Sequence, residues 1–104
     1  MAQNEHEDAI ARAWALHREG RQNDAINAFE TVTKRAPDNI DALYGLGLAQ
    51  RAAGDKEGAR ATFQQCFALL TAALEGAPGT DRFEMLQRMV EQRIEEIAEN
   101  STAK

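Results

Sequence analysis

Several residue types are scarce in this sequence, and each shortage argues against a class of protein. Cys66 is the only cysteine among 104 residues, so the chain cannot form an internal disulfide or a cluster of thiolate metal ligands. No apolar run approaches the roughly 20 residues that span a bilayer, and the acidic N-terminus is the reverse of a signal peptide. Twelve Lys and Arg stand against 17 Asp and Glu, and the net charge of −5 lacks the basic surface of a nucleic-acid-binding protein. We therefore expect a cytoplasmic protein that binds neither nucleic acid nor a membrane.

Proline is almost as scarce, and its two positions mark breaks in a sequence rich in strong helix formers. Pro37 and Pro78 each lie close to such a break, and Gly20 and Gly54 are placed to end helices. Apolar residues recur at helical spacing in five stretches, residues 5–19, 22–35, 40–53, 56–74 and 81–99. Candidate N-caps stand at Asp38, Asp55 and Asp81. The pattern predicts a single all-α domain of five helices.

The chain repeats itself after 34 residues. The shift superposes Ala15 on Ala49, Gly20 on Gly54, Ala25 on Ala59 and Phe29 on Phe63. In both copies a helix-ending glycine is followed, at the same distance, by a small residue and then an aromatic one four positions later. Small residues let two helices approach closely, and the phenylalanine fills the space one turn on. The repeat therefore predicts two similar helix pairs.

These residues resemble the tetratricopeptide repeat family, whose pattern is Trp-x2-Leu-Gly-x2-Tyr, then Ala-x3-Phe, then Pro. The matching residues are Leu43, Leu46, Gly47, Ala59 and Phe63 in the second copy, and Ala25, Phe29 and Pro37 in the first. The resemblance implies a short right-handed α-solenoid of two helix-turn-helix repeats, about 6–39 and about 40–73. A linker at about 75–80, a capping helix at about 81–99 and a tail at 100–104 would follow. It also implies a non-catalytic domain for protein–protein interaction.

Candidate catalytic and metal-binding residues do not form a site. His6 and His17 are separated by eleven helical residues, or about 16 Å, and cannot share a metal ion. Cys66 falls in a row of small inward positions, which predicts a buried, protonated thiol. Gly45 and Gly47 lie in mid-helix with no strand before them, which indicates close helix packing rather than a phosphate loop. We therefore expect no enzyme activity, no metal and no cofactor.

One row of side chains is predicted to bind a partner. In an array of helix pairs the first helix of each pair lines the concave side, and the row next to the packing row faces the groove. This row consists of Ile10, Trp14 and His17 in the first copy and Tyr44, Leu48 and Arg51 in the second. It contains the only Trp and the only Tyr, so we expect it to bind a peptide or helix with apolar anchors. The alternative is that the last helix or the N-terminus covers the row and makes it core.

The resemblance also suggests a mode of binding that this sequence lacks. Some family members hold an acidic C-terminal peptide with Lys, Arg and Asn on the same helices. The corresponding positions here are Ile10, Trp14, Gly45 and Leu48. The sequence therefore lacks that clamp, which leaves apolar anchors as the expected means of binding.

A second candidate surface lies on the last predicted helix. Its apolar stripe consists of Phe83, Leu86, Val90, Ile94 and Ile97. Met85, Met89 and Arg93 flank this stripe, as either a widened core edge or an exposed contact surface. Glu95 and Glu96 are expected on the solvated outer side. Two repeats are fewer than the three or so that such stacks need. The alternative function is therefore self-assembly, as in a homodimer, or a role as one domain of a larger assembly protein.

Overall fold

The structure is a computed structural model that describes the backbone of residues 2–76 and 81–102 and the side chains of residues 7–76 and 82–97. It contains five helices, α1 (Ala2–Arg18), α2 (Gln22–Arg35), α3 (Ile40–Ala52), α4 (Lys56–Gly76) and α5 (Asp81–Thr102). The described residues contain no strand. The predicted all-α fold is confirmed, and each helix boundary lies within three residues of its predicted position.

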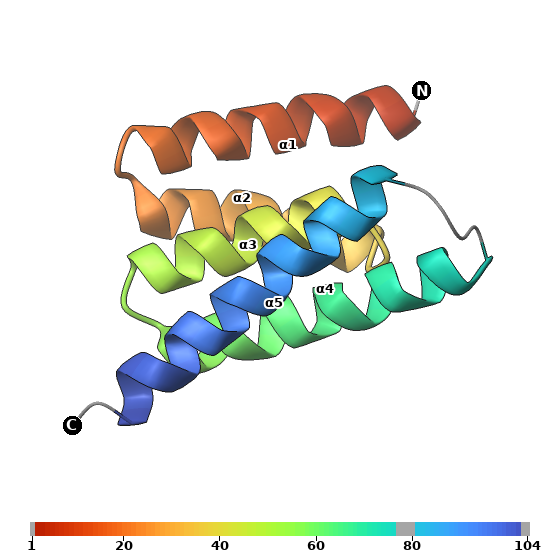
Figure 1. The fold of residues 1–104 in the computed structure, drawn as a ribbon. Coiled ribbons are helices and arrows are strands. Elements are labelled where there is room, and N and C mark those ends of the chain that lie inside the picture. Colours follow the sequence, from red (N-terminus) through yellow and green to blue (C-terminus); the bar gives the residue numbers. More distant parts are fainter. Residues whose placement is uncertain (1, 77–80, 103–104) are drawn as a thin grey trace.

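Each helix packs on the next one along the chain, and α1 also contacts α3 (Figure 1). The helices α1, α3 and α5 run in the same direction, while α2 and α4 run in the opposite one (Figure 1). Helix α5 is tilted relative to the other four and packs mainly on α4. The result is a short helical solenoid, with α3 in its centre.

The turns between paired helices use the predicted glycines. Gly20 has a φ of 83° and Gly54 a φ of 91°, the left-handed conformation that ends a helix and that favours glycine. After each glycine the next amide donates back into the helix, from Arg21 to the carbonyl of Leu16 and from Asp55 to that of Gln50. The two copies of the repeat therefore share one turn geometry.

The N-caps of the helices follow the prediction less closely than the turns do. Asp55 accepts a hydrogen bond from the amide of Gly58, as expected of an N-cap. The predicted N-cap Asp38 is wrong, because Asn39 takes this role and accepts from the amide of Ala42. Residues 37 and 38 form a turn, and the helix begins at Ile40, directly after Asn39. The side chain of Asp81 lies outside the described residues.

Two buried phenylalanines organise the core from opposite sides of α3. Phe29 on α2 and Phe63 on α4 are both fully buried. A Cβ atom added to Gly45 would collide with the ring of Phe29, and one added to Gly47 would lie 2.5 Å from the ring of Phe63. Around Phe29 the buried residues are Ile10, Ala13, Ala25, Val32, Ala42, Leu46 and Ala49. Around Phe63 they are Leu43, Ala59, Cys66, Leu70, Val90 and Ile97.

We predict that Gly47→Ala destabilises the protein through a clash with Phe63. Overpacking costs about 1–3 kcal/mol, whereas alanine gains only about 1 kcal/mol over glycine within a helix. We expect a net loss of up to about 2 kcal/mol in the free energy of unfolding, measured by urea denaturation. In a Phe63→Leu background, the same change should lower the free energy of unfolding by a smaller amount.

The control for this prediction is Gly76→Ala. It is the same chemical change at the end of α4, where an added Cβ meets no atom within 4 Å. It should leave stability unchanged or slightly raised. An equal cost for Gly47→Ala with and without the Phe63 ring would contradict the proposed contact.

Candidate functional site

The six residues of the predicted binding row lie on α1 and α3, but not all of them reach the surface. Ile10 is 7% exposed and belongs to the core around Phe29, which removes it from any open groove. Trp14, His17, Tyr44 and Leu48 are half-buried, and Arg51 is exposed. The row therefore contributes both to the core and to the surface.

Aromatic side chains join the two halves of the core along this row. The Trp14 ring meets Phe29 edge-on at 5.4 Å between centroids and lies 6.4 Å from Tyr44. Tyr44 in turn lies 5.9 Å from Phe63. Such pairs contribute about 0.5–1.5 kcal/mol beyond the burial of their surface. Trp14 and Tyr44 are therefore part of the packing, and not simply anchors that face solvent.

An apolar hollow opens beside this aromatic chain, between α3 and α5. Its volume is about 260 Å³. It is lined by Ile40, Asp41 and Tyr44 of α3 and by Arg82, Phe83, Met85, Leu86 and Met89 of α5. Met85 is 65% exposed and Met89 39% exposed, which favours the contact-surface interpretation of these two methionines over the core-edge one.

A second hollow has the opposite character. This cationic hollow, of about 350 Å³, is lined by His17 of α1, Leu48, Arg51 and Ala52 of α3, and Arg93 of α5. His17 is held by Gln22, whose Oε1 lies 2.7 Å from Nδ1 of the ring. Three of the five lining residues are therefore basic. We call the surface of α1, α3 and α5 that carries both hollows the hollow face.

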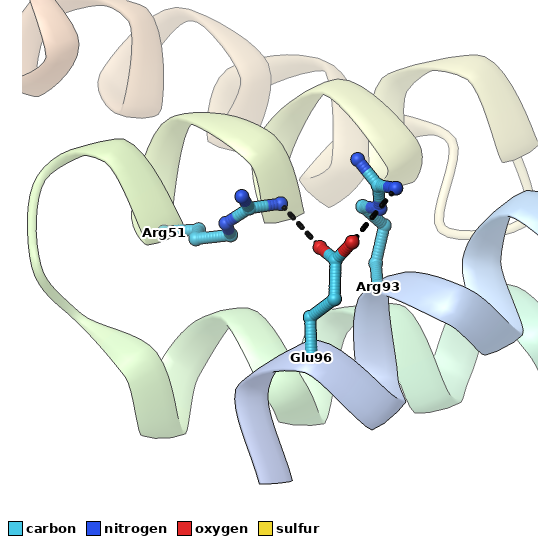
Figure 2. Close-up of polar contacts among 3 residues, drawn as sticks. All are labelled: Arg51, Arg93 and Glu96. Atoms are coloured by element: carbon cyan, nitrogen blue, oxygen red, sulfur yellow. Dashed lines mark hydrogen bonds and ion pairs between the residues drawn. The ribbon is translucent and has the colours of Figure 1, made fainter. Parts of the chain in front are cut away.

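Glu96 lies between the two arginines of the cationic hollow (Figure 2). Its Oε2 accepts a hydrogen bond from Nη2 of Arg93 at 3.1 Å. Its Oε1 lies 3.2 Å from Nη1 of Arg51, an ion-pair distance, but this contact lacks the alignment of a hydrogen bond. The pair with Arg51 joins α5 to α3 (Figure 2). Because the side chains are partly exposed, such a pair contributes only about 0–1 kcal/mol to stability.

Tyr44 lies between the two hollows. It lines the apolar hollow, and burial raises the pKa of its phenol. The positive charges of Arg93 and Arg51 lower the same pKa, but by less than burial raises it. The phenol therefore stays protonated at neutral pH and can donate or accept a hydrogen bond there.

The structure brings together two surfaces that the sequence could only predict separately. Tyr44 and Met89 line one hollow, and Arg51 and Arg93 line the other. The end helix therefore covers part of the row and adds a second wall to what remains open. Sequence reasoning missed Glu96, which was expected on the outer side. Its spacing of three residues from Arg93 is a local signal for that pair, but the contact with Arg51 depends on the tertiary fold.

Cys66 lies apart from both hollows, in the core around Phe63. Its thiol is fully buried and donates to the carbonyl oxygen of Ile40 at 3.8 Å. Burial raises the pKa of this thiol to about 11, with a smaller contribution from the negative charge of Asp41. The predicted buried, protonated thiol agrees with this environment.

Among the residues that the structure describes, no group of three or more His, Cys, Asp or Glu residues is placed to hold a metal ion. Within the same residues, no helix combines the length and the apolar character needed to cross a membrane.

Helices that pack in chain order around repeated glycine turns define a helical-repeat protein. The family model described as tetratricopeptide repeat matches residues 10–66, more than half of the chain. The chain therefore belongs to the tetratricopeptide repeat family, and the predicted resemblance is confirmed. Domains of this family generally mediate protein–protein interactions and are typically non-catalytic. None of the curated proteins matches the chain.

We predict that Cys66 is inert toward thiol reagents in the folded protein. With a pKa of about 11 instead of the ordinary 9.0, the thiolate fraction at pH 8 falls on the order of a hundredfold. Alkylation by iodoacetamide at pH 8 should be at least that much slower in buffer than in 8 M urea. The protection should weaken as the pH rises toward 11.

An exposed cysteine on the same helix provides the control. In a Cys66→Ala background, Gln65→Cys places a thiol at an exposed position of α4. It should react at similar rates with and without urea. Equal rates for native Cys66 under the two conditions would contradict its burial.

Proposed function

We propose that the protein is a non-catalytic interaction domain that binds a peptide or a helix of a partner protein on its hollow face. The observation that carries this proposal is the meeting of the predicted row on α1 and α3 with the methionine surface of α5 around two adjoining hollows. The repeat limits of about 6–39 and about 40–73, the linker and the capping helix belong to the same proposal. A cytoplasmic location stays a prediction from the sequence.

The composition of the hollow face supports this function. Half-buried Tyr44 and exposed Met89 border one cavity, so a partner side chain could bury apolar area against rigid aromatic and adaptable thioether groups. The apolar cavity, of about 260 Å³, is large enough to hold an apolar side chain of such a partner. Both features favour a protein partner.

A homodimer is the alternative function, and one observation favours it. Met85 and Met89 are large apolar side chains exposed next to each other on α5. A second copy could cover them by helix pairing. The net charge of −5 on each chain opposes such pairing at low salt. Light scattering at micromolar concentration distinguishes the two, and we expect a monomer.

We predict that Met89→Asp abolishes most of the binding while leaving the fold intact. Met89 is 39% exposed, so its loss removes little core packing, but a charge in the apolar hollow would be buried by a partner. A central anchor is typically worth at least about 2 kcal/mol, so affinity should fall about thirtyfold or more. The measurement is calorimetric titration with a partner recovered by affinity purification from the native host.

The matched control is Ala68→Asp. It introduces the same residue at an exposed position of α4 that lines neither hollow. Ala68→Asp should bind the partner with the same affinity as the parent protein. Ala68→Asp and Met89→Asp should both keep the circular dichroism spectrum of the parent protein. Equal losses for the two variants, or no loss for Met89→Asp, would place the interaction elsewhere.

A further inference from the structure

The cationic hollow has a charge that differs from that of the whole molecule. The chain carries a net charge of −5, yet the ionisable residues that line this cavity are His17, Arg51 and Arg93. Glu96 touches both arginines and can neutralise only one of their two charges. An excess of positive charge therefore remains at a concave site beside an apolar cavity. This combination favours a ligand with a negative group.

The contacts of Glu96 are also incomplete. The Oε1 atom is buried at ion-pair distance from Arg51 without a hydrogen bond, and Nε of Arg93 is buried without a hydrogen-bond partner. Buried polar groups normally have such partners, and each missing one has a cost. The side chain of Arg51 is partly exposed. Arg51 can therefore turn toward a better-placed carboxylate without opening the core.

We propose, on the basis of the function proposed above, that the partner segment carries an Asp or Glu side chain that binds Arg51 and Arg93. A neighbouring apolar side chain of the same segment fills the apolar hollow. Glu96 is then an internal competitor, because its carboxylate occupies the position that the partner carboxylate takes. On binding, the poorly aligned contact between Glu96 and Arg51 is replaced by a well-aligned contact between Arg51 and the partner carboxylate.

The spacing of the two groups on the partner follows from the helices that line the hollows. Tyr44 and Arg51 are seven residues apart on α3, or about 10 Å. Met89 and Arg93 are four residues apart on α5, or about 6 Å. The apolar and acidic side chains should therefore be about 6–10 Å apart. This corresponds to two or three positions in an extended peptide and to four to seven in a helix.

This arrangement differs from the clamp that the family resemblance describes. The positions of that clamp hold Ile10, Trp14, Gly45 and Leu48, and Ile10 is buried. The cations here come from the end of α3 and from α5, which lies beyond the matched residues 10–66. The side chain of Glu96, which is not a chain terminus, is the group already bound. We therefore commit the site to a side-chain carboxylate within a segment.

The test begins with a phage-displayed library of random twelve-residue peptides selected on the full chain and counter-selected on Met89→Asp. The expected result is enrichment of an apolar residue together with Asp or Glu at the stated spacing. Backbone NMR shifts with a selected synthetic peptide should locate its contacts on the hollow face. Peptides that bind this face without an acidic residue would overturn this inference and leave the proposed function intact. If no peptide is enriched, or if the shifts lie elsewhere, both proposals are wrong.

Two variants then test the competitor role, each with the selected peptide and with its Asn or Gln counterpart. Glu96→Gln should tighten binding of the acidic peptide about two- to fivefold, because it removes the competing charge. Arg51→Gln should weaken it about tenfold or more and leave the amide counterpart nearly unaffected. Ala68→Asp serves again as the control, and thermal melts verify that each variant is folded. Unchanged or weaker binding by Glu96→Gln would contradict the competitor role of Glu96. Equal losses of affinity for the acidic peptide and its amide counterpart with Arg51→Gln would contradict the contact between Arg51 and the partner carboxylate.

Discussion

The close approach of α3 to its two neighbours is the contact on which the rest of the molecule depends. Gly45 and Gly47 leave space on α3 for the rings of Phe29 and Phe63, and both rings are fully buried there. Interiors are packed as densely as organic crystals, so even one added carbon on either glycine would force the helices apart. The position of α3 sets those of Tyr44, Leu48 and Arg51, and therefore the shape of the hollow face.

Helix α5 is positioned by a different kind of contact. Val90 and Ile97 are buried against the core around Phe63, whereas Met85 and Met89 on the same helix stay exposed. A capping helix normally presents a polar outer face to solvent and closes the array. Here α5 and α3 line a cavity of about 260 Å³ between them. The same element therefore completes the core and forms one wall of the candidate site.

The sequence predicts most of the fold because its signals are local. Gly20 and Gly54 end helices through their own backbone conformation, and the spacing to Phe29 and Phe63 is repeated exactly 34 residues apart, so both are visible without tertiary information. The site was harder to predict. Arg51 and Glu96 lie in different helices, 45 positions apart, and they meet only through the tertiary packing of α5. The burial of Ile10 likewise depends on how far α1 overlaps α3, which helical periodicity does not determine.

The positions of Trp14 and Tyr44 show why stability and binding are difficult to separate in so small a protein. Trp14 contacts Phe29 and Tyr44 contacts Phe63, so each supports the fold and borders the candidate site at the same time. Truncating either residue would alter both properties, and a loss of binding would not identify its cause. Met89 and Arg51 line the hollows, are exposed, and belong to neither buried cluster. A division of this kind would let the proposed binding surface change its partner by surface substitution while the glycine and phenylalanine contacts keep the helices in place.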